Sequence, residues 1–68
     1  MSQYAKGDTL YVVRSGMREL INRQVLVIGP GRTEQMVEVE SIGGWTFPHG
    51  LTSANVAEAN LSYSPKAV

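Results

Sequence analysis

The stretch that decides the fold is residues 24–40, which read QVLVIGPGRTEQMVEVE. Residues 24–28 are apolar and rich in β-branched side chains, as in a strand that is covered on both faces. Residues 35–40 alternate, so that their valines would face a core while Glu38 and Glu40 face solvent. The stretch therefore predicts two neighbouring strands.

The link between these strands, IGPGR, has two interpretations. Nucleotide-binding loops need a longer glycine pattern that opens a helix, and here a strand follows instead. A type II turn fits better, because Pro30 fixes φ at the first central position and Gly31 can take a positive φ at the second. We expect a hairpin with Arg32 at its tip, where its side chain could reach a phosphate or a carboxylate.

Working outward, residues 9–14 (TLYVVR) predict a strand with Leu10 and Val12 on one face. Residues 17–22 are expected to form a connecting loop, or at most one helical turn, because so short a segment does not make a stable helix. The N-terminal side of the stretch thus adds one strand and one irregular connection.

On the C-terminal side, residues 45–47 predict a short fourth strand that Pro48 ends. Asn55 and Glu58 have the spacing of a capping box, which predicts one helical turn. Residues 60–63 are expected to be the closing strand. The whole pattern predicts an all-β fold, a small five-stranded SH3-like barrel with one short helical turn before the last strand, and closure would remove exposed sheet edges.

The chain of 68 residues is long enough for one domain. We expect a flexible N-terminal tail at 1–5, a single barrel domain at 6–63 and a flexible C-terminal tail at 64–68. There is no Cys and one His, so disulfides, thiolate metal sites and a histidine metal cluster are not expected, nor is any cofactor. Apolar runs reach four residues at most, and the start is not a signal peptide, so we expect a cytoplasmic protein without a membrane span.

The segments KGDTLYVVRSG, QVLVIGPG and MVEVE together resemble the opening of a KOW-type, SH3-like barrel over residues 7–40. Members of that family sit on ribosomes, RNA polymerase or RNA, so the resemblance implies such partners. Two features depart from the family. Its glycine before the second strand is replaced by Asn22, which tolerates the left-handed conformation. Its Lys- and Gly-rich RNA-contacting loop is replaced by residues 17–21.

Charge is distributed unevenly although the net charge is zero. Residues 1–32 carry five Lys or Arg against two acidic residues, and residues 33–68 carry one against four. If the barrel brings the arginines of the first half together, they would form a salt-sensitive phosphate grip. The candidate basic rim consists of Arg14, Arg18, Arg23 and Arg32. The apolar side chains of the same loop leave open a packed connection or a protein-docking patch.

Trp45, Phe47 and Met36 are candidates for apolar or aromatic anchoring of a partner, with core packing as the alternative. Catalytic residues are not indicated. His49 has no recognisable nucleophile, and the two glutamates of MVEVE look like a solvated strand face.

These patterns predict a non-enzymatic binding module that docks on gene-expression machinery, touching nucleic acid or the polymerase or ribosome that handles it. The alternative is a protein-binding adaptor, an inhibitor or a self-assembling module of a phage or mobile element, with a homo-oligomer formed through Met36, Ile42 and Trp45. A third alternative is a symmetric reductase whose pore is built from several copies. No small-molecule substrate is evident from the sequence.

Overall fold

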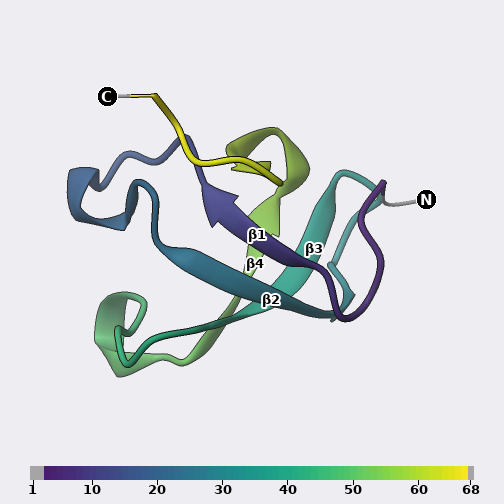
Figure 1. Cartoon of the computed structure of the whole chain (residues 1–68). Helices are drawn as coiled ribbons and strands as arrows, with labels where there is room; N and C mark the ends of the chain where they lie inside the picture. The colour runs from purple at the N-terminus through teal and green to yellow at the C-terminus, as the bar shows by residue number, and fades with distance from the viewer. Residues whose placement is uncertain (1–2, 68) are drawn as a thin grey trace.

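The computed structural model describes residues 3–67 and has an all-β architecture (Figure 1). Its five strands form one antiparallel sheet in the order β4-β3-β2-β1-β5. The strands are β1 Thr9–Val12, β2 Gln24–Pro30, β3 Met36–Ser41, β4 Ser53–Ala57 and β5 Leu61–Ser62. Four consecutive strands pair as a meander, and β5 returns to pair with β1. The prediction of a five-stranded, barrel-like all-β fold is confirmed.

Helical structure in residues 3–67 is limited to three single 3-10 turns: η1 Arg18–Leu20, η2 Pro48–Gly50 and η3 Glu58–Asn60. None of them is long or apolar enough to span a membrane. The turn η1 lies in the connection between β1 and β2, as expected. A helical turn before the last strand was predicted, and η3 is that turn, although it begins at Glu58 and not after Asn55.

The core follows from the alternation of apolar residues in the first three strands. Leu10 and Val25 face each other across β1 and β2, and both are fully buried. Phe47, from the segment before η2, and Leu61, from β5, complete the core. The buried residues are Leu10, Val12, Val25, Val27, Val37, Val39, Phe47 and Leu61.

The hairpin between β2 and β3 exists, but its turn is not the predicted one. Gly29 and Pro30 belong to β2, and Gly31 does not take a positive φ, so the expected type II turn is wrong. Gly31 N–H donates to Met36 O at 3.1 Å, which makes residues 32–35 the tip. Proline has no backbone N–H to donate. Pro30 is tolerated in β2 because it lies beyond the residues that pair with β1, so no hydrogen bond to that strand is lost.

The fourth strand was misplaced by the sequence pattern. Residues 45–47 make only an isolated bridge, in which Phe47 N–H donates to Leu51 O at 2.7 Å. Residues 53–57 form β4 instead, so the capping box at Asn55 is also wrong. The aromatic side chains of residues 45–47 turn inward, whereas SANVA pairs along the whole of β3.

The sheet is not closed. β4 and β5 are its two ends, and no ladder joins them in residues 3–67. Closure was expected to remove the sheet edges, and that expectation is not met on the β4 side. The outer edge of β4 therefore remains unpaired, next to η3, which connects β4 to β5.

Residues near both ends of the described segment are hydrogen-bonded to the rest of the fold. The Tyr4 ring packs on the core and its hydroxyl donates to Leu61 O at 3.0 Å. Near the other end, Lys66 is hydrogen-bonded to Asn22. The predicted domain boundaries at 6 and 63 leave out these contacts, while residues 1, 2 and 68 lie outside the described residues.

Candidate functional site

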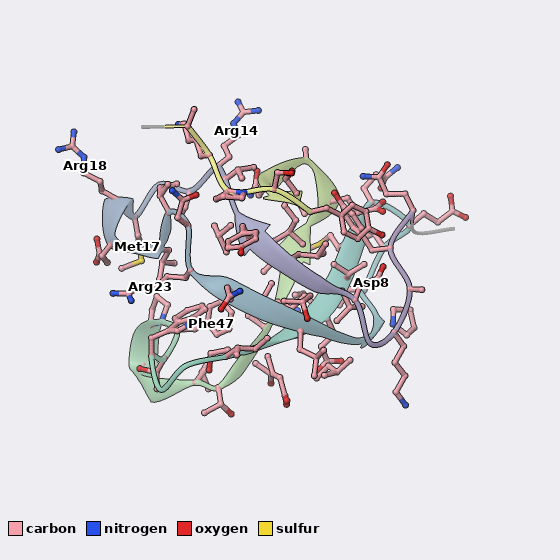
Figure 2. The ribbon with its side chains drawn as sticks, viewed as in Figure 1. Asp8, Arg14, Met17, Arg18, Arg23 and Phe47 are labelled. Atoms are coloured by element: carbon pink, nitrogen blue, oxygen red, sulfur yellow. The ribbon has the colours of Figure 1, made fainter. Side chains whose placement is uncertain are left out.

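One end of the sheet carries most of the exposed arginines. Arg14 follows the end of β1, Arg18 lies in η1 and Arg23 directly precedes β2. All three side chains are exposed. In Figure 2, Arg18 and Arg23 lie on the side of the molecule away from Asp8, and Arg14 points outward at the top. Arg23 is fixed by its Nε–H, which donates to Glu19 O at 3.2 Å. The connection between β1 and β2 thus collects three of the four predicted arginines.

Asn22 brings the backbone of a fourth cationic residue, Lys66, to this end. It takes a positive φ of 65°, the left-handed conformation that asparagine was expected to tolerate there. Its N–H donates to Val12 O at 2.6 Å. Its side-chain amide makes two bonds to the backbone of Lys66, accepting from N–H at 2.7 Å and donating to the carbonyl at 3.1 Å. Figure 1 shows the C-terminal segment running past the end of β1.

We call Arg14, Arg18, Arg23 and Lys66 the basic end. Glu19 is the only carboxylate in the segments that supply it, residues 13–24 and 64–67. The sequence contained no signal for Lys66, because the contact joins residues 44 positions apart. Asn22 itself was noticed for its backbone conformation, and its side-chain role follows only from the fold.

Arg32 is not part of this group. Arg23 precedes β2 and Arg32 follows it, and a seven-residue strand separates its ends by about 23 Å at about 3.3 Å per residue. At the far end, Arg32 N–H donates to Asn55 Oδ1 at 2.8 Å while its side chain is exposed. The predicted rim of four arginines is therefore wrong, and three arginines with Lys66 replace it.

The aromatic anchoring candidates are largely internal. Phe47 is 6% exposed and belongs to the core, which contradicts its use as a surface anchor (Figure 2). Trp45 is half-buried, and its ring packs edge to face on the Phe47 ring with 4.6 Å between the ring centroids. Its Nε1–H donates to Gln24 O at 3.1 Å. Met17, by contrast, is 40% exposed in the loop that carries the arginines.

A groove of about 380 Å³ runs along the unpaired side of β4. One wall is the strand itself, including Ala54 and Val56, and the other is the end of β1 with Leu20 from η1. Met36, the third anchoring candidate, is half-buried and lines this groove as well as a second one of about 560 Å³ that Arg32 and Glu38 also line. Within residues 3–67, Arg14 is the only charged residue that lines the groove.

No metal-binding arrangement was found among residues 3–67. No group of three or more His, Cys, Asp or Glu side chains is placed to hold a metal ion there. His49 is exposed on η2 with a positive φ of 67°. Glu38 and Glu40 lie on the outer face of β3.

Asp8 lies at the opposite end from the basic end and joins the two chain ends. Its Oδ2 accepts from Ala5 N–H at 2.9 Å and from the Tyr63 hydroxyl at 2.7 Å. These two bonds, the first more than the second, hold the pKa of Asp8 below its ordinary value of 3.8. The Tyr63 ring also meets the Tyr4 ring edge to face at 5.1 Å.

This arrangement predicts an acid-sensitive contribution to stability. Because the pKa of Asp8 is lowered in the folded state, its stabilising effect is present above about pH 4 and is lost as the pH falls through the lowered value. Urea unfolding between pH 7 and pH 2 should show a shallower acid decline for Asp8→Asn than for the parent. Tyr63→Phe should be intermediate, since it removes one of two donors. If stability declined equally with falling pH in all three proteins, Asp8 would not be the source of the acid sensitivity.

Comparison with protein-family models, with curated proteins and with solved structures gives no match for this chain.

Proposed function

We propose that the protein is a non-enzymatic binding module that docks on gene-expression machinery by holding a nucleic-acid backbone at its basic end. The observation that supports this most is the clamp between Asn22 and Lys66. It holds the backbone of Lys66, a fourth cationic residue, against the loop that already carries three exposed arginines. Arginine and lysine side chains are the groups that contact phosphates in such complexes.

Charge separation also supports the proposal. The segments of the basic end contain four cations and one carboxylate, so they carry a net charge of +3. The rest of the chain contains Lys6 and Arg32 against five acidic residues, which gives −3. A protein of zero net charge can therefore present a positive field on one side, and that side would orient a polyanion.

The proposal predicts binding that depends steeply on salt. With four cations on a single-stranded RNA, affinity should fall about 10²–10³-fold when salt rises from about 20 to about 200 mM, because the slope is about −0.7 per phosphate contact. Fluorescence anisotropy with a labelled 20-nucleotide RNA would measure it. Arg14→Ala/Arg18→Ala should weaken binding and flatten the slope by about 1.4.

The matched control removes two cations from the opposite end of the sheet. Lys6→Ala/Arg32→Ala has the same change in charge, and both side chains are exposed. This control should bind like the parent. Equal losses for the two double variants would show nonspecific attraction rather than a site at the basic end. Absence of binding at about 20 mM salt would overturn the nucleic-acid role.

A protein-binding role is the second candidate. The groove beside β4 favours it, because the groove exposes apolar side chains next to an unpaired strand. Arg14 lines the groove and also belongs to the basic end, so both surfaces meet at one residue.

A further inference from the structure

The outer edge of β4 presents unpaired backbone groups. Thr52 O accepts from Ser41 N–H, and Glu58 N–H donates to Gln35 O, so the even-numbered residues of this segment bond to β3. In an antiparallel ladder the residues between them point their N–H and C=O groups the other way. Among residues 3–67, no other segment makes backbone hydrogen bonds with Ser53, Asn55 or Ala57.

The two edges of the sheet differ in how they are protected. β5 is two residues long, and the Tyr4 hydroxyl bonds to Leu61 O on it. β4 is five residues long and has the sequence SANVA, with no charge and no proline. Natural edge strands usually carry charges, proline or bulges that prevent pairing with another chain. The composition of β4 leaves this edge ready to pair.

We infer that β4 pairs with β4 of a second copy of this chain, antiparallel, about a two-fold axis at Asn55. This register uses every outward backbone group of the strand. Asn55 lies opposite Asn55 of the second copy, and Ser53 lies opposite Ala57 of the second copy. Small, uncharged side chains meet along the whole pair, so no like charges face each other across the axis.

The groove supports the same register. Val56 and Ala54 point toward the core but are only half-buried, because the sheet stays open beside them. About an axis at Asn55, Val56 lies opposite Ala54 of the second copy on that same face. Pairing would therefore place apolar side chains at the mouths of both grooves while it completes the ladder.

The predicted oligomer differs from the one expected from the sequence. That expectation used Met36, Ile42 and Trp45, all of which are half-buried. Pairing of one five-residue strand per copy is a small contact beside standard interfaces of about 1,200–2,000 Å². The dimer should therefore dissociate on dilution, within the range of about 5 to 500 µM that sedimentation equilibrium covers. Its formation does not require the proposed nucleic-acid role.

Ala57→Pro tests the edge directly. Ala57 has a φ of −65°, the angle that proline imposes, and its N–H points away from β3. The variant should keep the far-ultraviolet circular dichroism of the parent and dissociate at least tenfold more readily. Ala57→Ser keeps the N–H and should associate like the parent. A parent that stays at 7.4 kDa up to about 500 µM, or a folded Ala57→Pro that associates as the parent does, would overturn the proposal.

The position of the axis has its own test. Asn55→Lys and Asn55→Asp each place like charges opposite each other, so each alone should associate at least tenfold more weakly than the parent. An equimolar mixture should recover association, because unlike charges then meet at the axis. Asn55→Gln is the neutral control and should dimerise. A mixture no stronger than its two components would overturn this register. These readouts use no nucleic acid, so they fail or succeed separately from the proposed function.

Discussion

Leu10→Ala should lower the free energy of unfolding by about 2–5 kcal/mol. Leu10 is fully buried and faces Val25, and β1 lies between β2 and β5 in the sheet. The loss combines the missing transfer free energy of the side chain with the cavity that is left. Domains of this size have only about 3–5 kcal/mol from a single core. We therefore expect the variant to be largely unfolded at 25 °C.

Leu51→Ala is the matched control for this prediction. Leu51 is 54% exposed, and its contact with Phe47 uses its backbone carbonyl, which the substitution keeps. Its effect should stay within about 0.5 kcal/mol. Urea unfolding followed by circular dichroism and by Trp45 fluorescence would measure both variants. Similar losses for the two variants would mean that the core does not lie where the first three strands place it.

The first three strands were predictable from the sequence because the first two are rich in β-branched and other apolar side chains and the third alternates valine with glutamate. β4 was not, since Ala and Asn are depleted in strands and Val56 is the one β-branched side chain in SANVA. What makes it a strand is β3, which supplies a partner to every residue from Ser53 to Ala57. The aromatic segment 45–47 carried a stronger local strand signal, but its rings are used to cover the core.

The candidate site was predictable to the extent that it lies in one loop. Three arginines around η1 stay together because the connection between β1 and β2 is short. Arg32 was grouped with them wrongly, although the length of β2 alone separates it from Arg23. Lys66 could not have been predicted, because its position depends on the hydrogen bonds that Asn22 makes after the chain has returned through β5.

Gly31→Ala should destabilise the protein by about 1–3 kcal/mol. A Cβ added at Gly31 would lie 2.6 Å from Met36 O and 2.7 Å from Met36 Cβ. Both are contacts that the backbone of β3 would have to relieve by moving. Gly31 N–H also donates to Met36 O at 3.1 Å, so the same movement would disturb the bond that closes the hairpin. Urea unfolding at neutral pH would measure the loss.

Gly29→Ala is the matched control from the same segment. A Cβ there would meet nothing within 4 Å, and Gly29 has no positive φ. Alanine also restricts the unfolded chain, so this variant should match the parent or gain about 0.4–1 kcal/mol. If Gly29→Ala lowered the free energy of unfolding as much as Gly31→Ala does, the segment would need glycine for backbone flexibility and not for the close approach to Met36.

Gly31→Asn distinguishes two reasons for glycine at this position. One is the close approach of Met36, and the other is the positive φ of the type II turn that the sequence suggested. In a type II turn the glycine has a positive φ, which asparagine adopts far more readily than alanine, so Gly31→Asn would be the milder substitution. In the structure the obstacle is any Cβ at all, because Met36 fills the space. Asparagine should then destabilise the hairpin at least as much as alanine. A clearly milder effect of asparagine would favour the type II turn predicted from IGPGR, with Pro30 in that turn and not at the end of β2.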